Sequence, residues 1–267
     1  MQIRKAGFSF LKISEIFITH MHGDHLFGIY GLLSTMSLLG RKSDVTVYAP
    51  AAFKTVLDSF LLHFGASFCF KINHVAVKCS APEIIFETRK IEVLAFPLNH
   101  RIECYGFIFR EKPPMRNVHK YKIVSDSLTL YEIARLKEGL DVVRDSGEVL
   151  INSEFTYIPY IPRSFAYCCD TAPFTLLPEY VRGVNLLYHE ATFTKDLKQM
   201  AMETFHSTAS DAAECAKSAN AGKLLLGHLS ARYKDNLTIL QEACEIFPES
   251  EIAEPGKEYL VDIIKPD

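Results

Sequence analysis

Four side chains that commonly hold metal ions are crowded into the stretch ITHMHGDH at residues 18–25. They are His20, His22, Asp24 and His25. His20 and His22 are two positions apart after the apolar run 14–19, so in extended backbone their side chains leave the same face. Gly23 then lets the chain turn, and the acid and the histidine beyond it can serve a second ion nearby. Imidazole nitrogens and a carboxylate are ligands that suit zinc, so the stretch predicts a metal site.

Three more candidate ligands stand at the ends of predicted strands far along the chain. They are His100 after IEVLAFPLN (91–99), Asp170 after SFAYCC (164–169) and His228 at the end of KLLLGH (223–228). Loops at the carboxyl ends of strands are where α/β proteins gather functional groups. The seven ligands divide naturally into two sets joined by one bridging residue. The sets are His20, His22 and His100 for the first ion and Asp24, His25 and His228 for the second, with Asp170 as the bridge.

The remaining histidines test how selective this pattern is. Three of them lie in helical or loop contexts and are assigned to the surface or to structural hydrogen bonds: His63, His74 and His119. His189 precedes Glu190 at a strand end. His206 precedes Ser207 and Thr208, so a hydrogen bond at the start of a helix is one interpretation of it.

The elements that must position these residues are short apolar strands alternating with helices. The predicted strands are 14–19, 45–50, 91–96, 104–110, 164–169, 185–190 and 223–228, and the predicted helices are 26–40, 51–65, 208–222 and 235–247. Thr208 can cap the third of these helices and Gly222 can end it. The alternation predicts an α/β layered fold built as one domain, residues 1–267.

Composition and charge agree with a globular protein. Hydrophobic residues make up 48% and charged residues 23% of the chain, and the net charge is −3, which argues against coating nucleic acid by charge alone. No apolar run reaches the roughly 18–20 residues that a membrane span needs, and the N-terminus does not resemble a signal peptide. We therefore expect a cytoplasmic protein that binds no membrane. The seven cysteines show neither disulfide nor CxxC spacing, which favours buried free thiols.

One segment, residues 110–163, breaks the layered pattern. Prolines bracket it at both ends, and the sequence between them is polar and irregular, as in an inserted arm rather than a core. Its first part is basic, with Arg110, Lys112, Arg116, Lys120 and Lys122 against Glu111 alone. A solvated surface loop and an arm that contacts phosphates through Lys112 and Arg116 are equally good interpretations of this stretch.

Four motifs together resemble one enzyme family. They are THMHGDH (19–25), YCCDT (167–171), HEATF (189–193) and GHLSARY (227–233). The HxHxDH pattern is shared by the whole metallo-β-lactamase superfamily, whereas HEATF, the isolated His206 and GHLSARY resemble the ribonuclease Z family of tRNA 3′-processing endonucleases. The resemblance implies an αββα sandwich, the same seven ligands, two Zn²⁺ ions per chain (with Mn²⁺ as the alternative) and precursor tRNA as substrate. It also implies a homodimer.

The resemblance further implies roles for individual residues. Asp24 would ligate metal and help to activate the attacking water. Glu190 and His206 would form a relay that donates a proton to the leaving 3′ oxygen. Arg232 matches a position near the substrate phosphate, with a surface salt bridge as an equally weighted alternative, and Ser230 beside it is a weaker candidate.

The sequence departs from the family in two places. The family's N-terminal strands and glycine-acid-glycine loop precede the residues that match 1–10 here, so we expect an N-terminally shortened sandwich with an exposed sheet edge. The family's tRNA-clamping arm often carries a Gly-Pro-rich stretch, whereas residues 110–163 contain no Gly-Pro pair. This predicts a divergent form of the arm.

Three functions remain open on the sequence. The leading one is a zinc-dependent endoribonuclease that removes the 3′ trailer from tRNA precursors and leaves a 3′-hydroxyl. The second is a hydrolase of the same superfamily that acts on small phosphodiesters, thioesters or lactones. The third is a truncated, inactive chain that binds metal and serves as a partner subunit. Cleavage of a tRNA precursor separates the first from the other two.

Overall fold

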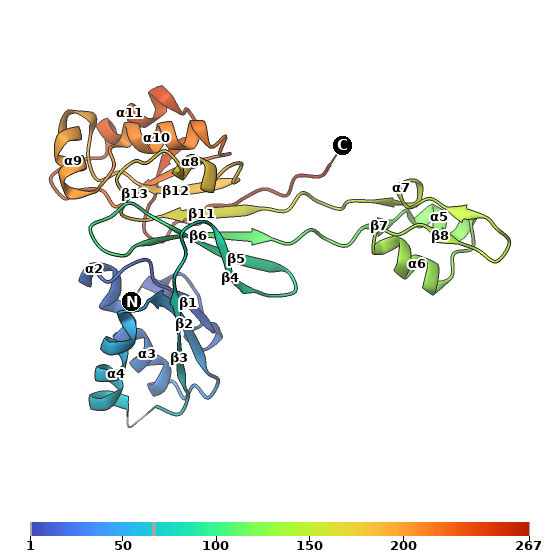
Figure 1. Ribbon diagram of the computed structural model, residues 1–267, viewed down its shortest axis with the longest axis horizontal. Helices are drawn as coiled ribbons and strands as arrows, with labels where there is room; N and C mark the ends of the chain where they lie inside the picture. Colours follow the sequence, from blue (N-terminus) through green and yellow to red (C-terminus); the bar gives the residue numbers. More distant parts are fainter. Residues whose placement is uncertain (1, 66–67, 267) are drawn as a thin grey trace. The chain divides into compact units, whose positions relative to one another are not determined.

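The chain folds into two compact units, which are described separately. The computed structural model describes residues 2–65 and 68–266 (Figure 1). The core unit comprises residues 1–86, 93–109 and 164–259, and the inserted unit comprises 87–92, 110–163 and 260–267. Among the described residues, no helix is both long and apolar enough to cross a membrane.

The first sheet of the core unit is parallel and has the strand order β1–β2–β3. Its strands are β1 (Glu15–Phe17), β2 (Val45–Pro50) and β3 (Ile72–Val77). Parallel neighbours need a crossover, and helices supply it. The helices of this half are α1 (Gln2–Lys5), η1 (Phe10–Lys12), α2 (Gly23–Leu26), α3 (Gly28–Leu38) and α4 (Phe53–Phe64). Leu33, Met36 and Phe53 of α3 and α4 are completely buried with Val47 of β2, so the helices cover one face of this sheet (Figure 1).

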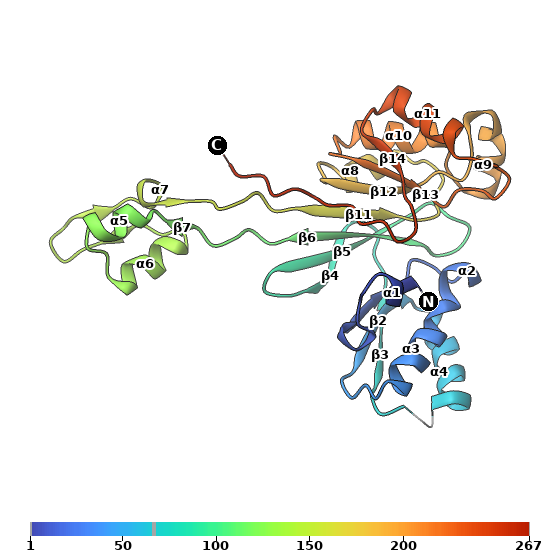
Figure 2. The same cartoon turned by 180° about the vertical axis from the view of Figure 1, so that it is seen from behind.

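The second sheet has seven strands in the order β14–β13–β12–β11–β6–β5–β4. The strands are β4 (Glu83–Glu87), β5 (Ile91–Pro97), β6 (Tyr105–Glu111), β11 (Ser164–Cys168), β12 (Leu186–Glu190), β13 (Leu224–Gly227) and β14 (Ser250–Ile252). The four from β11 to β14 are parallel, so their carboxyl ends share one edge. Helices α8 (Leu177–Tyr180), α10 (Ala209–Ser218) and α11 (Leu237–Ile246) lie together on one face of these strands, and η3 (Lys195–Leu197) and α9 (Lys198–Thr204) follow β12 (Figure 2).

The other faces of the two sheets pack together through aromatic side chains. Phe17 of β1 stacks on Tyr48 of β2 with ring centroids 4.9 Å apart, and it lies 5.5 Å from Phe107 of β6. Val93 and Ala95 of β5 are buried in the same cluster. The core unit is therefore layered helix, sheet, sheet, helix, as the sequence and the resemblance predicted.

Most helices and strands predicted for the core unit are confirmed, but the predicted end of one helix is wrong. Thr208 caps α10 as expected, because its hydroxyl accepts the Asp211 amide hydrogen while the Asp211 carboxylate accepts from the Thr208 amide. The prediction that Gly222 ends this helix is wrong, since α10 ends at Ser218. A Cβ atom at Gly222 would lie 2.6 Å from the Asn185 carbonyl oxygen, so glycine is needed there for a close backbone approach.

The inserted unit, in which residues 110–163 lie, is folded, although no helix or strand was predicted for them from the sequence. It contains β7 (Asn117–Val118), α5 (Lys120–Ser125), α6 (Leu130–Lys137), β8 (Val142–Val143), β9 (Val149–Leu150), α7 (Asn152–Phe155) and β10 (Thr156–Tyr157). β7 pairs with β10 and β8 with β9, both antiparallel. The unit has its own small core: Val118, Leu128, Leu136, Val142, Leu150 and Phe155.

An ion pair at the edge of this small core holds α6 in place. Glu132 is 6% exposed, and its carboxylate accepts a hydrogen bond of 2.7 Å from Nε of Arg144 and another from the Thr129 amide at the start of the helix. Arg144, followed by Thr129, lowers the pKa of Glu132 to about 2. The pair therefore stabilises the unit above the ordinary carboxyl pKa, and this stabilisation is lost as the pH falls toward about 2.

Candidate metal centre

The stretch ITHMHGDH forms one wall of the site. His20 follows β1 and is completely buried, and its Nε2 atom lies 3.1 Å from Nδ1 of His22. Asp24 and His25 lie in the short helix α2, with Oδ2 and Nε2 3.4 Å apart. A Cβ atom at Gly23 would lie 2.4 Å from the ring of Phe27, so a larger residue here would require this exposed ring to move.

The opposite wall comes from strand ends of the second sheet. His100 follows β5, Asp170 follows β11 and His228 follows β13, while Glu190 is the last residue of β12. β11, β12 and β13 are parallel neighbours, which is why Asp170, Glu190 and His228 meet at one edge. His228 has a φ of 55°, a left-handed conformation that bends the chain directly after its strand.

Asp170 lies between the two predicted ligand sets. Its Oδ2 atom is 3.6 Å from Nε2 of His20, 3.5 Å from Nε2 of His25 and 3.9 Å from Nε2 of His100. Its other oxygen, Oδ1, is 3.4 Å from Nε2 of His228. The carboxylate is 2% exposed. A single buried acid thus faces histidines of both sets.

The donor geometry and charge state fit metal ions. Two nitrogen ligands of one tetrahedral zinc ion lie about 3.3 Å apart, given Zn–N bonds near 2.0–2.1 Å. The Nδ1 atom of His22 is 3.1 Å from Nε2 of His20 and 3.3 Å from Nε2 of His100, so three imidazoles converge at this spacing. Burial and its histidine neighbours lower the pKa of His20 to about 3, and burial lowers the pKa of His100. Neutral imidazoles are the form that binds metal.

The groups whose donor atoms converge within 4.8 Å follow the predicted division closely. One group is His20, His22, His100 and Asp170, and a second is Asp24, His25 and His228. Two further groups add residues outside the predicted ligand set: Cys169 with His20 and His25, and His206 with Asp170 and His228. The seven predicted ligands are thus brought together in the core unit.

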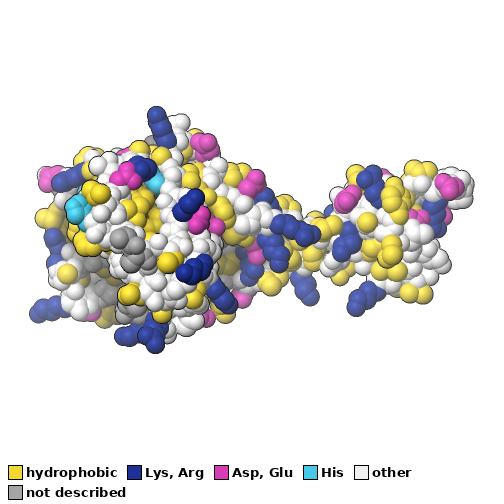
Figure 3. All heavy atoms as spheres, turned by 90° about the horizontal axis from the view of Figure 1, so that it is seen from below, with side chains coloured by type: hydrophobic (Ala, Val, Ile, Leu, Met, Phe, Trp, Pro, Cys, Tyr) yellow, Lys and Arg dark blue, Asp and Glu magenta, His cyan; other side chains and the backbone are white. Residues whose placement is uncertain are grey.

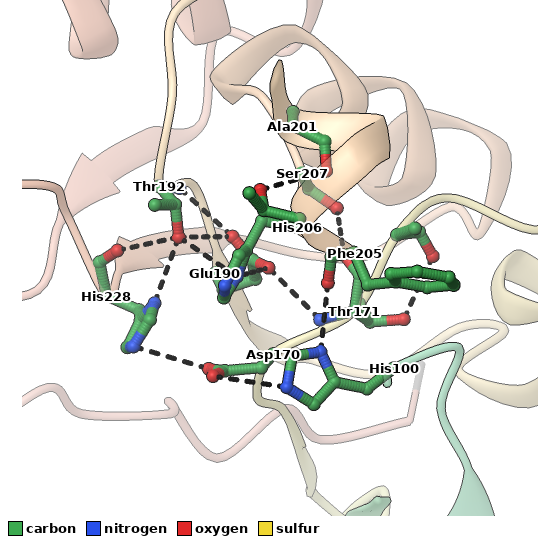
Figure 4. Close-up of polar contacts among 12 residues, drawn as sticks. His100, Asp170, Thr171, Glu190, Thr192, Ala201, Phe205, His206, Ser207 and His228 are labelled. Carbon is green, nitrogen blue, oxygen red and sulfur yellow. Dashed lines mark hydrogen bonds and ion pairs between the residues drawn. The ribbon is translucent and has the colours of Figure 1, made fainter. Parts of the chain in front are cut away.

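A second buried acid, Glu190, holds His206 beside these ligands (Figure 4). The Nδ1 atom of His206 is 2.8 Å from Oε1 of Glu190, and Glu190 is completely buried. The same carboxylate accepts from the amides of Thr171 and Thr192 at 3.0 Å and from the Thr192 hydroxyl at 2.8 Å. Burial opposes protonation of His206, but the hydrogen bond to Glu190 and the negative charges of Glu190 and Asp170 together outweigh it, and the pKa of His206 is raised.

The backbone aims the His206 ring at the metal ligands. Phe205 adopts a left-handed conformation with a φ of 59°, and its carbonyl lies 3.0 Å from Nδ1 of His100. The His206 ring centroid is 5.4 Å from those of His100 and His228, and it stacks on the latter. The interpretation of His206 as only a hydrogen bond at the start of a helix does not account for this placement.

Three residues of the site were missed on the sequence although they lie inside the quoted motifs. Thr171 and Thr192 bind Glu190, and Oγ1 of Thr192 is also 2.9 Å from Nδ1 of His228. The Cys169 thiol, 1% exposed, lies 3.4 Å from Nδ1 of His25 and from Oδ1 of Asp170. Their positions in the motifs could have indicated them: Cys169 and Thr171 flank Asp170 in YCCDT, and Thr192 follows two residues after Glu190 in HEATF.

The predicted substrate-contacting residues lie in two places. Arg232 in the core unit packs 5.0 Å over the Phe193 ring, and its Nε atom donates to Oγ of Ser230 at 3.0 Å. Among the described residues Arg232 forms no ion pair, and its guanidinium also contacts the sulfur of Met200 at 3.1 Å. In the inserted unit Lys112 pairs with Glu87 at 2.6 Å, and Nε of Arg116 donates to Oγ1 of Thr156 at 2.6 Å.

Some histidine side chains are visible on the face of the core unit that Figure 3 shows, and Lys and Arg side chains occur along the inserted unit. The remaining histidines behave as expected: His63 contacts the Ser59 carbonyl, and His74 contacts the Ala49 carbonyl. All seven cysteines are free thiols, four of them buried.

Comparison with known proteins assigns the family. No protein-family profile matches the chain. Ribonuclease Z of Phocaeicola vulgatus is 38% identical over 266 residues, which cover 100% of this chain and 86% of that protein. Ribonuclease Z of Cytophaga hutchinsonii is 40% identical and is matched over 90% of this chain and 76% of its own length.

Solved structures agree on the fold. The short form of human tRNase Z superposes with a TM-score of 0.65 at 22% identity, covering 98% of this chain and 84% of that one. A metallo-β-lactamase fold protein from Bacillus subtilis superposes with a TM-score of 0.62 at 17% identity, covering 93% and 77%. The expected fold is therefore confirmed, and the identity to its curated relatives places the chain in the ribonuclease Z family.

Proposed function

We propose that this chain is a metal-dependent endoribonuclease that removes the 3′ trailer from precursor tRNA and leaves a 3′-hydroxyl. The observation that carries the proposal is the buried Asp170 between two groups of converging ligands, with the Glu190–His206 pair beside them. The curated relatives carry the name ribonuclease Z, and a solved neighbour is a tRNase Z. The donor set suits two zinc ions, and manganese accepts the same ligand types.

The chain's residues supply ligands, orientation and a proton. Bound zinc would provide positive charge for the scissile phosphodiester and lower the pKa of the attacking water. We assign His20, His22 and His100 to one ion, Asp24, His25 and His228 to the other, and Asp170 to both. The exposed Asp24 carboxylate also orients the water as it attacks phosphorus.

Glu190 and His206 complete the reaction at the leaving group. As the bond from phosphorus to the 3′ oxygen breaks, His206 donates its proton to that oxygen, and Glu190 stabilises the charged ring beforehand. The tRNA keeps the 3′-hydroxyl and the trailer keeps the phosphate. The buried carboxylate also fixes the ring orientation, because it is itself held by Thr171 and Thr192.

Contacts to the RNA are assigned to two groups of residues. Arg232, with Ser230 beneath it, would bind a phosphate near the cleavage point. In the inserted unit Arg116 lines a cavity of about 580 Å³ together with Lys265 and is the better candidate there. Lys112 is the weaker one, since Glu87 occupies its ammonium group. The resemblance also supports a homodimer, which sedimentation would measure.

We expect cleavage of a precursor tRNA with a 3′ trailer at a single position. A 5′-labelled precursor should give one product whose 3′ end, mapped by sequencing, carries a hydroxyl at the trailer boundary. A chelator should abolish the product, and added zinc should restore it. Intact precursor at high concentrations of zinc-loaded protein would contradict the proposed function, and turnover of small phosphodiesters in that experiment would favour the broader hydrolase interpretation.

A further inference from the structure

Arg101 is an exposed arginine that directly follows the ligand His100 and was not assigned a role. Its Nη2 atom donates a hydrogen bond of 2.7 Å to the carbonyl of Glu203, in the last turn of α9. Within the described part of the chain it makes no other hydrogen bond and no ion pair. A guanidinium carries five N–H donors, so most of its donor capacity and all of its charge are available to a ligand.

Arg101 lies next to the proton-donating residue. His100 binds the carbonyl of Phe205 and Arg101 binds the carbonyl of Glu203, so two consecutive residues hold the turn that leads to His206. The Arg101 guanidinium thus contacts the backbone three residues before His206.

A second arginine contacts the other part of the same helix. Nη1 of Arg232 is 3.1 Å from the sulfur of Met200, which lies three residues before Glu203, whose carbonyl Arg101 binds. Among the described residues, Arg232, like Arg101, forms no ion pair with a carboxylate. Two guanidinium groups that form no ion pair among the described residues therefore contact the same short helix. This favours a ligand with several negative charges, and the planar guanidinium group matches the oxygens of a phosphate.

We propose that Arg101 binds a phosphate of the RNA strand adjacent to the phosphate that is cleaved, while Arg232 binds another. This inference rests on the proposed function, since it needs an RNA substrate. Arg101 would then determine how tightly a polynucleotide is held at the metal centre and would contribute little to hydrolysis of a substrate that has only one phosphate.

The test compares two substrates with the variant Arg101→Ala. For precursor tRNA we expect KM to rise about 10- to 100-fold, the loss typical of a hydrogen-bonded charged contact. The slope of log KM against log salt concentration should fall by about 0.7–0.9, which corresponds to one phosphate contact. Hydrolysis of bis(p-nitrophenyl) phosphate, which has a single phosphate, should keep its kcat and KM. Arg101→Lys should recover most of the salt slope.

Arg182→Ala is the matched control. It removes one positive charge from an exposed arginine of the core unit whose guanidinium is already paired with Glu179, so both substrates should be cleaved as by the unmodified chain. Equal losses of kcat on both substrates in Arg101→Ala would show that Arg101 only holds the turn before His206, and would overturn the proposal. An unchanged KM and salt slope would overturn it too. Failure of the unmodified chain to cleave precursor tRNA would instead remove the proposed function itself.

Discussion

Replacing Asp170 with alanine is expected to remove both metal ions from each chain together. Its Oδ2 faces three imidazoles of which two belong to the first set, and its Oδ1 faces His228 of the second. Without the carboxylate, each ion loses a negatively charged ligand, and no negative charge remains between the two sets of imidazoles. Because bound ions supply several kcal/mol of transition-state stabilisation, kcat/KM for precursor tRNA should fall about a thousandfold or more.

Zinc per chain, measured by elemental analysis after desalting, checks this expectation. Asp170→Asn keeps the shape of the side chain and should also lose metal, which separates loss of charge from a packing defect. Asp58→Ala is the control, because it removes an exposed carboxylate of α4 whose one ion-pair partner among the described residues is Lys54. Two zinc ions retained in a folded Asp170→Ala protein would contradict the bridge.

His206→Ala is expected to leave the metal in place and to slow the reaction. A positioned general acid contributes about 10²- to 10⁴-fold, so kcat should fall by that amount while zinc content stays the same. Glu190 acts through the same ring, and the double variant His206→Ala with Glu190→Gln should be little slower than His206→Ala alone. Single-turnover cleavage of precursor tRNA measures the rate.

The geometry makes this a sharp test, because His206 is close enough to Asp170 and His228 to be considered a ligand. If His206 binds metal, His206→Ala will lose zinc along with activity, and the relay assignment is then wrong. His63→Ala provides the control: it removes an exposed imidazole of α4 that lies against the Ser59 carbonyl and the Phe64 ring, and neither zinc nor rate should change.

The convergence of the seven candidate ligands could be predicted from the sequence because each of them follows a strand signal. IEVLAF, SFAYCC and KLLLGH are short apolar runs, and parallel strands bring their carboxyl ends to one edge wherever the chain returns. Gly23 between the two ligand pairs was also informative, since the chain turns into α2 at this residue. Each of these signals lies within a short stretch of the sequence, so it can be recognised without the structure.

Other features of the structure could not be predicted because they depend on contacts between residues that are far apart in the sequence. That Arg232 packs on Phe193 instead of pairing with an acid follows from tertiary neighbours that sequence spacing does not reveal. The prediction for Gly222 was wrong for the same reason, because its close neighbour is Asn185, which directly precedes β12. Lys112 looked free in a basic run, yet its partner Glu87 lies 25 positions earlier.

The inserted unit escaped prediction because its elements are short. Its strands have two residues each, and its longest helix, α6, has eight, so neither a period of two nor one of 3.6 develops. What holds it is a small set of buried side chains around Leu136 and the Glu132–Arg144 pair. Proline and charge density marked where the unit begins and ends, but not that it folds.

Zinc titration of the metal-free chain, with precursor tRNA cleavage as the readout, tests the central claim most directly. Stepwise addition of zinc to the chelated and desalted protein should restore 3′ cleavage, with the rate reaching its plateau at two equivalents per chain. Full cleavage without metal, or a plateau at one equivalent with no second ion bound, would contradict a two-metal centre bridged by Asp170.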